Sequence, residues 1–174
     1  MKNSAFTLVE LLVVVLIIGI LTAIAVPQYQ KAVDKSRLSE LTILTKHVKD
    51  MQEVYYLAKG SYAADCVELG VNVNGYTLDS NNFLIDTNKK YRIACNWGGA
   101  RVSSQIKPDV NSGSNFLALE YYFDHSENVN AGKAQCWSND DTRYKNMCAE
   151  YCGQDVSVVY NTLGNPNGNS CYRK

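Results

Sequence analysis

Glu10 is an ionisable side chain inside an apolar segment. It is the only one between Phe6 and Val26, where every other residue is apolar, small or hydroxylated. As a helix, this segment would be about 30 Å long, which matches the hydrocarbon core of a bilayer. A carboxylate at the centre of a membrane helix costs about 3 kcal/mol, and less near its end, so such a group is expected to serve a function and to have a cationic partner. A plain membrane anchor would not need this charge.

The carboxylate of Glu10 can form an ion pair with a cationic group. Lys2 is close in sequence but would lie outside the lipid. Cleavage between Ala5 and Phe6 would create an α-amino group four residues before Glu10. That amine could pair with Glu10 in the same helix, or in a neighbouring helix shifted by about one turn. Pairing between helices would hold them together in an apolar bundle, where hydrophobicity alone does not distinguish helix from lipid.

The N-terminal residues resemble the signal of type IV pilins and their relatives. The shared pattern is a short basic leader, the residues FTLVE, and then an unbroken apolar run of about twenty residues, longer than the 7–15 of a conventional secretory signal. The resemblance implies that Phe6 is the first mature residue and the site of N-methylation. It also implies that Glu10 acts in assembly and that Gly19 and Pro27 soften the helix. Ala5 departs from the family's usual glycine before the cut, and because its side chain is small we expect slower cleavage at worst.

The same resemblance implies a function. The chain is expected to be a structural subunit of a type IV pilus, processed by a prepilin peptidase and polymerised as a homo-oligomeric helical filament. Before assembly it would span the inner membrane once, with its head outward, and afterwards it would lie in a surface filament. An assembly ATPase and a platform protein are implied partners. Nucleic acid is not an implied partner, because 17 basic side chains balance 17 acidic ones. The alternatives are a type II secretion pseudopilin and a minor pilin for DNA uptake or adhesion.

Periodicity and composition predict one anchored head. The expected divisions are a leader (1–5), a transmembrane and filament-core helix (6–27), an amphipathic helix half (28–60) and a globular head (61–174). One long helix should run from Thr7 to Ala58 and stop at Gly60. Its second half has an apolar stripe formed by Leu41, Leu44, Val48, Met51, Tyr55 and Ala58. A coiled coil is the alternative for this stripe, but the strands that follow need an apolar cover, which favours packing on a sheet.

The head is predicted to contain an antiparallel sheet. Strand signals fall at Phe83–Ile85, Tyr91–Cys95, Arg101–Ile106 and Phe116–Phe123, with a turn at 96–99. By resemblance, residues 63–82 form the connecting αβ-loop. The region after Asn128 is polar and cysteine-rich, so it should be fastened covalently. The expected fold class is therefore α+β, the type IV pilin fold: a long helical spine on an antiparallel head.

Six cysteines are candidates for disulfides: Cys66, Cys95, Cys136, Cys148, Cys152 and Cys171. Export to an oxidising compartment favours pairing, although six cysteines allow fifteen connectivities. We prefer Cys66 with Cys95, tying the connecting loop to the sheet. For the late four, Cys136 with Cys152 and Cys148 with Cys171 is a guess. Zinc is the rival interpretation, but the late spacings contain no paired CxxC knuckle.

No motif predicts catalysis or a cofactor. His125 lies between Asp124 and Ser126, but adjacency in sequence does not create a catalytic triad, and a polar loop after a strand explains it. His47 is expected to be a surface residue. Asp140 and Asp141 are a weak signal for calcium. Twelve tyrosines raise the idea of a conducting filament, but strands and interfaces explain them equally well.

Overall fold

A computed structural model describes residues 7–88, 90–107, 116–139, 141–153 and 169–173 of the chain. The chain divides into two compact units, residues 1–37 and residues 38–174. The division falls inside the long helix α1 (Leu8–Lys59), so the two halves of α1 are described separately. The ends of α1 lie one residue from the predicted Thr7 and Ala58, and Gly60 follows with a φ of 76°, in the left-handed region expected for a helix-ending glycine.

The first unit is the N-terminal half of α1. The helix continues without a break through Gly19 and Pro27. Its large apolar side chains are exposed, from Val14 at 44% to Leu8 at 79%. A helix that is apolar on every side must meet lipid or other helices. The exposed apolar side chains of this half of α1 are therefore available to lipid or to other helices.

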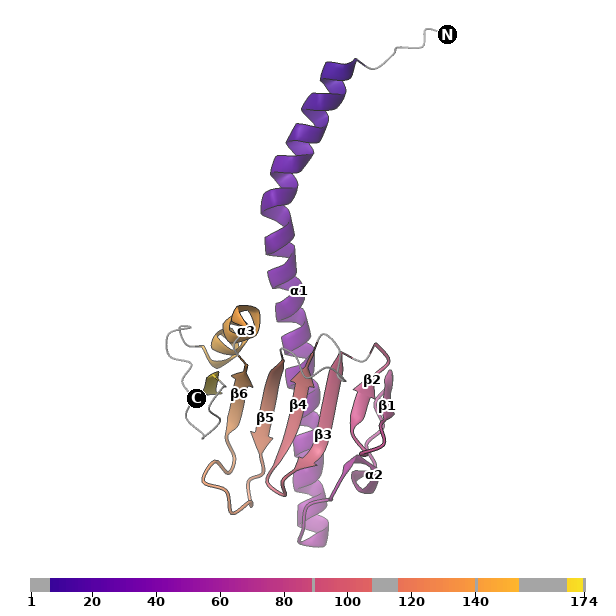
Figure 1. The fold of residues 1–174 in the computed structure, drawn as a ribbon. Coiled ribbons are helices and arrows are strands. Elements are labelled where there is room, and N and C mark those ends of the chain that lie inside the picture. The colour runs from indigo at the N-terminus through magenta and orange to yellow at the C-terminus, as the bar shows by residue number, and fades with distance from the viewer. Residues whose placement is uncertain (1–6, 89, 108–115, 140, 154–168, 174) are drawn as a thin grey trace. The chain divides into compact units, whose positions relative to one another are not determined.

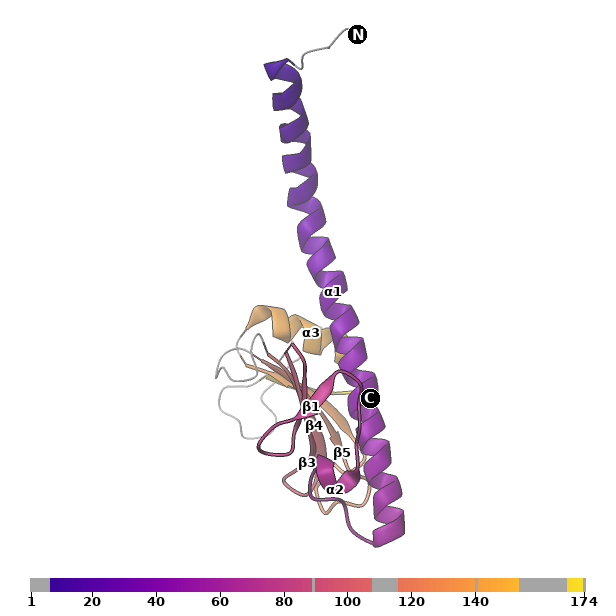
Figure 2. The same ribbon diagram turned by 90° about the vertical axis from the view of Figure 1, so that its right-hand side faces the viewer.

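The second unit is a two-layer α+β head. The C-terminal half of α1 covers one face of a seven-stranded antiparallel sheet in the order β1-β2-β3-β4-β5-β6-β7, and Figure 2 shows the two layers. The strands are β1 (Tyr76–Leu78), β2 (Leu84–Asp86), β3 (Tyr91–Trp97), β4 (Arg101–Ile106), β5 (Leu117–Tyr122), β6 (Ala134–Ser138) and β7 (Asn169–Arg173). Two short helices, α2 (Cys66–Leu69) and α3 (Thr142–Cys152), complete the described elements (Figure 1). Each strand pairs with its neighbour in sequence, so the sheet is a simple meander, as predicted for hairpin-connected strands.

The buried face of α1 differs in part from the predicted apolar stripe. Leu41 and Val48 are buried in the core as expected, and Leu44, Met51 and Tyr55 are partly buried against it, but Ala58 is exposed. Packing on the sheet is thus the correct interpretation of the stripe. Two polar residues, Thr45 and Gln52, lie fully buried on the same face.

Both polar residues have hydrogen-bond partners. The hydroxyl oxygen of Thr45 lies 2.5 Å from the carbonyl oxygen of Leu41 and 2.6 Å from Oγ of Ser104 on β4. The amide of Gln52 donates through Nε2 to the carbonyl oxygens of Ala63 (3.1 Å) and Cys95 (2.9 Å). Buried polar groups with partners do not carry the penalty of unsatisfied ones. These contacts connect the helix to the sheet and to the loop that leaves the helix.

Two regions contain more regular structure than the sequence predicted. The connecting region 63–82 includes α2 and β1, and the polar region after Asn128 includes β6, α3 and β7. The late region is thus part of the sheet as well as being held by disulfides. Its strands have few apolar residues, and the pairing of β6 with β5 and of β7 with β6 stabilises them where local propensity does not. Helix α3 does have local signals: Asp141 caps its first turn and Gly153 ends it with a φ of 65°.

Two smaller corrections concern a turn and an acidic pair. Strand β3 continues through Trp97, with an irregular register between Ala94 and Trp97, so the turn consists of Gly98, Gly99 and Ala100. Asp141, one half of the weak calcium signal, accepts hydrogen bonds from the first turn of α3. Asp140 lies outside the described residues.

The six cysteines form three disulfides, so one of the three predicted pairs is confirmed and the two late pairs are wrong. Cys66 pairs with Cys95, as preferred. The late pairs are Cys136 with Cys148 and Cys152 with Cys171, not the guessed alternative. Cys136 and Cys171 are directly opposite each other on β6 and β7, while Cys148 and Cys152 lie one turn apart on α3. The two bridges therefore run side by side, and the direction of α3 across the strands decides the pairing.

Candidate assembly segment

Thr7 and Glu10 cap the start of α1 through reciprocal hydrogen bonds. The backbone N–H of Thr7 donates to Oε2 of Glu10 at 2.8 Å, and the Thr7 hydroxyl donates to the same oxygen at 2.6 Å. In return, the backbone N–H of Glu10 donates to Oγ1 of Thr7 at 3.2 Å. This arrangement is a capping box, which satisfies backbone N–H groups that a helix leaves unpaired at its start. Its signal, Thr followed by Glu three residues later, is present in FTLVE.

The capping box changes the physical account of Glu10. The expected partner was a cation, whereas here the carboxylate accepts two hydrogen bonds from Thr7. Hydrogen bonds to an ionised acceptor are stronger than those between neutral groups, so they offset part of the cost of placing the charge in lipid. Ala5 and Phe6 lie outside the described residues. The predicted pairing of Glu10 with the amine of Phe6 therefore stays a prediction.

Helix α1 is long and apolar enough to cross a membrane, and the described residues contain one such helix. Within its first half, the hydroxyl of Thr22 lies 2.8 Å from the carbonyl oxygen of Ile18 and 3.0 Å from that of Gly19. These contacts satisfy the hydroxyl within the helix itself, as a membrane-spanning helix would require. Bonding of this kind also weakens and bends helices slightly. It falls inside the segment between Gly19 and Pro27 that the sequence predicted to be soft.

His125 does not form a catalytic arrangement with its neighbours. The Asp124 carboxylate binds Nζ of Lys49 at 2.7 Å, and the Ser126 hydroxyl donates to the carbonyl of Phe123 at 3.0 Å. The ring of His125 stacks on Tyr56, with 4.7 Å between centroids. Each of the three side chains is thus engaged in a different direction, as expected for a polar loop after a strand. His47 is exposed on α1, as predicted.

Lys49 ties the same loop to the helix. Its ammonium group lies 3.3 Å from Glu53 on the next turn, in addition to its contact with Asp124. Partial burial lowers the pKa of Lys49, but the hydrogen bond to Asp124 and the charges of Glu53 and Asp124 outweigh it, so the pKa is above its ordinary value. The loop after β5 is thereby held against the C-terminal half of α1.

Comparison with known proteins identifies the segment. The model of the prokaryotic N-terminal methylation motif matches residues 1–26. The type IV major pilin PilE of Neisseria gonorrhoeae is 39% identical over 69 residues, which cover 40% of this chain and 41% of PilE. The fimbrial protein EcpC of Eikenella corrodens is 36% identical over 122 residues, which cover 64% of this chain and 78% of EcpC. The chain belongs to the type IV pilin family.

The similarity of this pilin to its relatives is unevenly distributed. The type IV major fimbrial protein FimA of Dichelobacter nodosus is 44% identical over 64 residues, which cover 37% of this pilin and 40% of FimA. For PilE and FimA the match thus spans about two fifths of the relative, whereas for EcpC it extends over most of its length. No solved structure matches this pilin significantly. As a type IV pilin, the protein is a structural subunit of a type IV pilus, and the α+β fold and disulfides of its head fit that family.

Proposed function

We propose that this pilin is cut between Ala5 and Phe6, is held in the inner membrane by the first half of α1, and polymerises through that helix. The observation that carries the proposal is an exposed, all-round apolar helix whose single carboxylate, Glu10, is hydrogen-bonded at the helix start. The N-terminal methylation motif over residues 1–26 supports both the cleavage site and N-methylation of Phe6. An apolar surface of this kind is stable only in lipid or in a bundle of like helices.

Glu10 has a different partner at each stage in this scheme. In the membrane, Thr7 donates hydrogen bonds to the carboxylate, so the charge of the unassembled subunit is stabilised without a cation. In the filament, the α-amine of Phe6 on a neighbouring subunit approaches Glu10 and neutralises it. Ion pairs in a medium of low dielectric constant are strong, and a single pair in an apolar bundle also sets the axial register between helices.

The remaining partners follow from the family. They are a prepilin peptidase, an assembly ATPase and an inner-membrane platform protein, with further copies of the pilin as the main partner. Before assembly the head lies on the outer side of the inner membrane, and after assembly it lies on the surface of the filament. Nucleic acid is not a partner in this proposal. A type II secretion pseudopilin is the alternative, and the pilin and fimbrial names of the relatives favour the pilus.

Purification of sheared surface fibres tests the proposal. Mass spectrometry of the fibre subunit should show Phe6, N-methylated, as the first residue. A fibre subunit that retains Met1 and Lys2, or that begins after Ala23 or Ala25, would contradict the cleavage site. Deletion of the gene should remove the fibres and leave protein secretion intact. Loss of secretion with unchanged fibres would instead support the pseudopilin.

A further inference from the structure

The head carries a basic patch that neither cleavage nor filament assembly uses. The patch consists of Lys90, Arg92 and Lys107, at the place where β3 begins and β4 ends. The backbone N–H of Lys107 donates to the Lys90 carbonyl at 3.0 Å, so the pairing of the two strands continues into both lysines. Three cationic side chains are thereby brought together on neighbouring strands, which lie about 4.8 Å apart in a sheet.

All three side chains of the basic patch lie on the face of the sheet that α1 does not cover. The hydroxyl of Ser104 on β4 contacts Thr45 of α1, so Ser104 is on the face that meets the helix. Side chains alternate between the two faces along a strand, which places Lys107, three residues later, on the other face. Lys90 lies opposite Lys107, and Arg92 follows two residues after Lys90. The patch therefore stays outside the core between helix and sheet.

The basic patch has little negative charge beside it. Nη2 of Arg92 lies 3.4 Å from Oδ2 of Asp79, and Nε of Arg92 is buried without a hydrogen-bond partner. Within the described part of the chain, neither Lys90 nor Lys107 forms an ion pair with a carboxylate. Burial lowers the pKa of Lys107, and the charge of Arg92 lowers it further. An anion bound between these cations would relieve their repulsion.

Aromatic rings border the basic patch. The guanidinium of Arg92 lies over the ring of Phe83, 4.2 Å from its centroid, and Nζ of Lys107 lies 5.4 Å from the centroid of Phe116. The ring of Trp137 on β6 meets that of Phe116 edge-on, with 4.8 Å between centroids. Basic side chains beside tryptophan and phenylalanine are typical of protein surfaces that lie at the interface between membrane and water.

The basic patch lies at the end of the head where the second unit begins. Along α1, Thr45 contacts β4, and Gln52, two turns later, contacts the last part of β3. The start of β3, where the patch lies, is therefore beside the first residues of the unit 38–174. Pro27 lies only eleven residues before Leu38, which is about 16 Å of helix. The chain thus keeps this end of the head close to the segment that can span a membrane.

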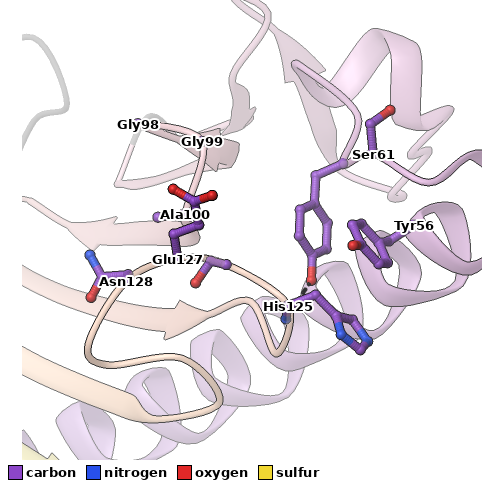
Figure 3. Close-up of a pocket in the computed structure, with 10 residues that line it drawn as sticks. Tyr56, Ser61, Gly98, Gly99, Ala100, His125, Glu127 and Asn128 are labelled. Atoms are coloured by element: carbon purple, nitrogen blue, oxygen red, sulfur yellow. Dashed lines mark hydrogen bonds between the residues drawn. The ribbon is translucent and has the colours of Figure 1, made fainter.

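The opposite end of the head differs in charge. A pocket of about 500 Å³ lies there, where the end of α1, the β3–β4 turn and the loop after β5 meet. Figure 3 shows Tyr56 and Ser61 on one side of the pocket, with Gly98, Gly99 and Glu127 on the other. Among the described residues that line it there is a carboxylate but no lysine or arginine. An anionic surface would therefore attract the end with the basic patch and not this one.

We infer that the basic patch docks on anionic phospholipid headgroups of the membrane that holds the first half of α1. The inference rests on the membrane anchoring proposed above. The lipid phosphates lie between Lys90, Arg92 and Lys107, with the aromatic rings at the level of the headgroups. Three cations are a weak site for a partner in solution, but the tether through α1 gives the headgroups a high effective concentration. Nucleic acid is disfavoured because the 17 basic side chains of the whole chain are balanced by 17 acidic ones.

Fluorescence quenching of the full-length chain in vesicles tests this inference. Trp97→Phe leaves Trp137, beside the patch, as the only tryptophan of the chain. The vesicles are phosphatidylcholine with or without phosphatidylglycerol, and both contain a lipid that carries a spin label on its headgroup as the quencher. Quenching of Trp137 should be stronger with phosphatidylglycerol. An ionic strength of about 0.5 M should remove the difference, because the Debye length is then only about 4 Å. Equal quenching in both kinds of vesicle would overturn the inference.

Matched variants assign the quenching to the basic patch. Each lysine near an anionic surface changes the ratio of docked to undocked heads by about fivefold, so Lys90→Gln with Lys107→Gln should lower that ratio by about 25-fold. Lys90→Arg with Lys107→Arg keeps both charges and should keep the docking. Lys46→Gln with Lys59→Gln removes two exposed lysines of α1 and serves as the control with the same net charge. Equal losses in the two glutamine variants would show that net charge alone matters, and would contradict the patch.

Flotation of the vesicles separates this inference from the proposed function. A chain held by the first half of α1 should float with vesicles of either composition, whereas docking changes only the quenching. A chain that floats but shows no difference in quenching would keep the anchor and exclude the docking. Failure to float would contradict the anchoring and the docking with it. Binding of a duplex oligonucleotide in neutral vesicles, with no effect of phosphatidylglycerol, would assign the patch to nucleic acid instead.

Discussion

Gln52 and Ala63 exchange two hydrogen bonds. Nε2 of Gln52 donates to the Ala63 carbonyl at 3.1 Å, and the Ala63 N–H donates to Oε1 of Gln52 at 2.9 Å. The same amide also donates to the carbonyl of Cys95 on β3 at 2.9 Å. One fully buried side chain thus fastens the helix to both the outgoing loop and the sheet.

Replacement of Gln52 by leucine should destabilise the head. The change removes the partner of the Ala63 N–H in the core, whereas the Ala63 carbonyl keeps a hydrogen bond from Nδ2 of Asn96 at 2.8 Å. An orphaned buried group costs about 1–3 kcal/mol. We expect the free energy of unfolding, measured by denaturant titration of the full chain in detergent, to fall by about that amount or more. Gln30→Leu changes an exposed glutamine on α1 and serves as the control. An unchanged midpoint for Gln52→Leu would show that these bonds contribute little.

Non-reducing peptide mapping should recover three disulfide-linked pairs: Cys66–Cys95, Cys136–Cys148 and Cys152–Cys171. Replacing both cysteines of one pair by alanine should lower the free energy of unfolding by about 2–4 kcal/mol. The two late pairs should affect α3 and β7 more than β1 to β4, because they join α3 to β6 and β7. A peptide linking Cys136 to Cys152 would contradict the structure, and free thiols in the exported protein would do so as well.

Glu10→Gln and Glu10→Leu should abolish fibres or leave few. Both remove the charge proposed to pair with the amine of Phe6, and neither touches the head. We expect normal cleavage and membrane insertion, with an unchanged unfolding midpoint, and a large drop in fibres counted by electron microscopy. If cells with Glu10→Leu made as many fibres as wild-type cells, the charge-pairing mechanism would be contradicted.

Thr7→Val tests the capping box separately from the charge. It removes the hydroxyl that donates to Glu10 and accepts from the Glu10 N–H, and loss of such a cap costs about 0.5–2 kcal/mol of helix stability. Hydrogen exchange of the first turn should become faster in the variant. Thr7→Ser keeps the hydroxyl and should retain slow exchange, so similar rates in the two variants would argue against the box.

The stabilisation from Lys49 should depend on pH. Because the folded-state pKa of Lys49 is raised, its contribution is fully present below the unfolded pKa of about 10.4 and is lost as pH rises through the higher folded value. Lys49→Met should therefore be less stable than wild type at neutral pH, with a difference that shrinks at strongly alkaline pH. Lys46→Met, at an exposed position, should show no such difference. A constant gap between Lys49→Met and wild type at all pH values would exclude this linkage.

The flexible part of α1 should lie between Gly19 and Pro27. Proline removes a backbone donor, and glycine weakens a helix by about 1 kcal/mol relative to alanine. The helix is unbroken in the subunit, so melting is predicted for the filament only. Cryo-electron microscopy of the filament checks this, and a straight, continuous helix through residues 20–26 would contradict the prediction.

The amino-acid sequence alone determined the features that depend on local pattern. The apolar run with Glu10, the bounds of α1, the strongest strands and the covering of a sheet by the helix were all predicted, because periodicity and residue type decide them without distant contacts. The capping box of Thr7 and Glu10 and the caps of α3 are also local signals in the sequence, because each depends on residues within one helical turn.

Only the tertiary structure decided the features that depend on contacts between distant segments. β6 and β7 are stabilised mainly by strand pairing, and burial of Gln52 depends on two carbonyl groups that the fold brings to it. The late disulfides depend on the direction of α3 across two strands, since the spacing of the four late cysteines does not decide among their three possible pairings. The pocket beside Tyr56 likewise exists only because three segments, far apart in the chain, end at the same place. Local propensity has no information about such convergence, which the packing of the whole head creates.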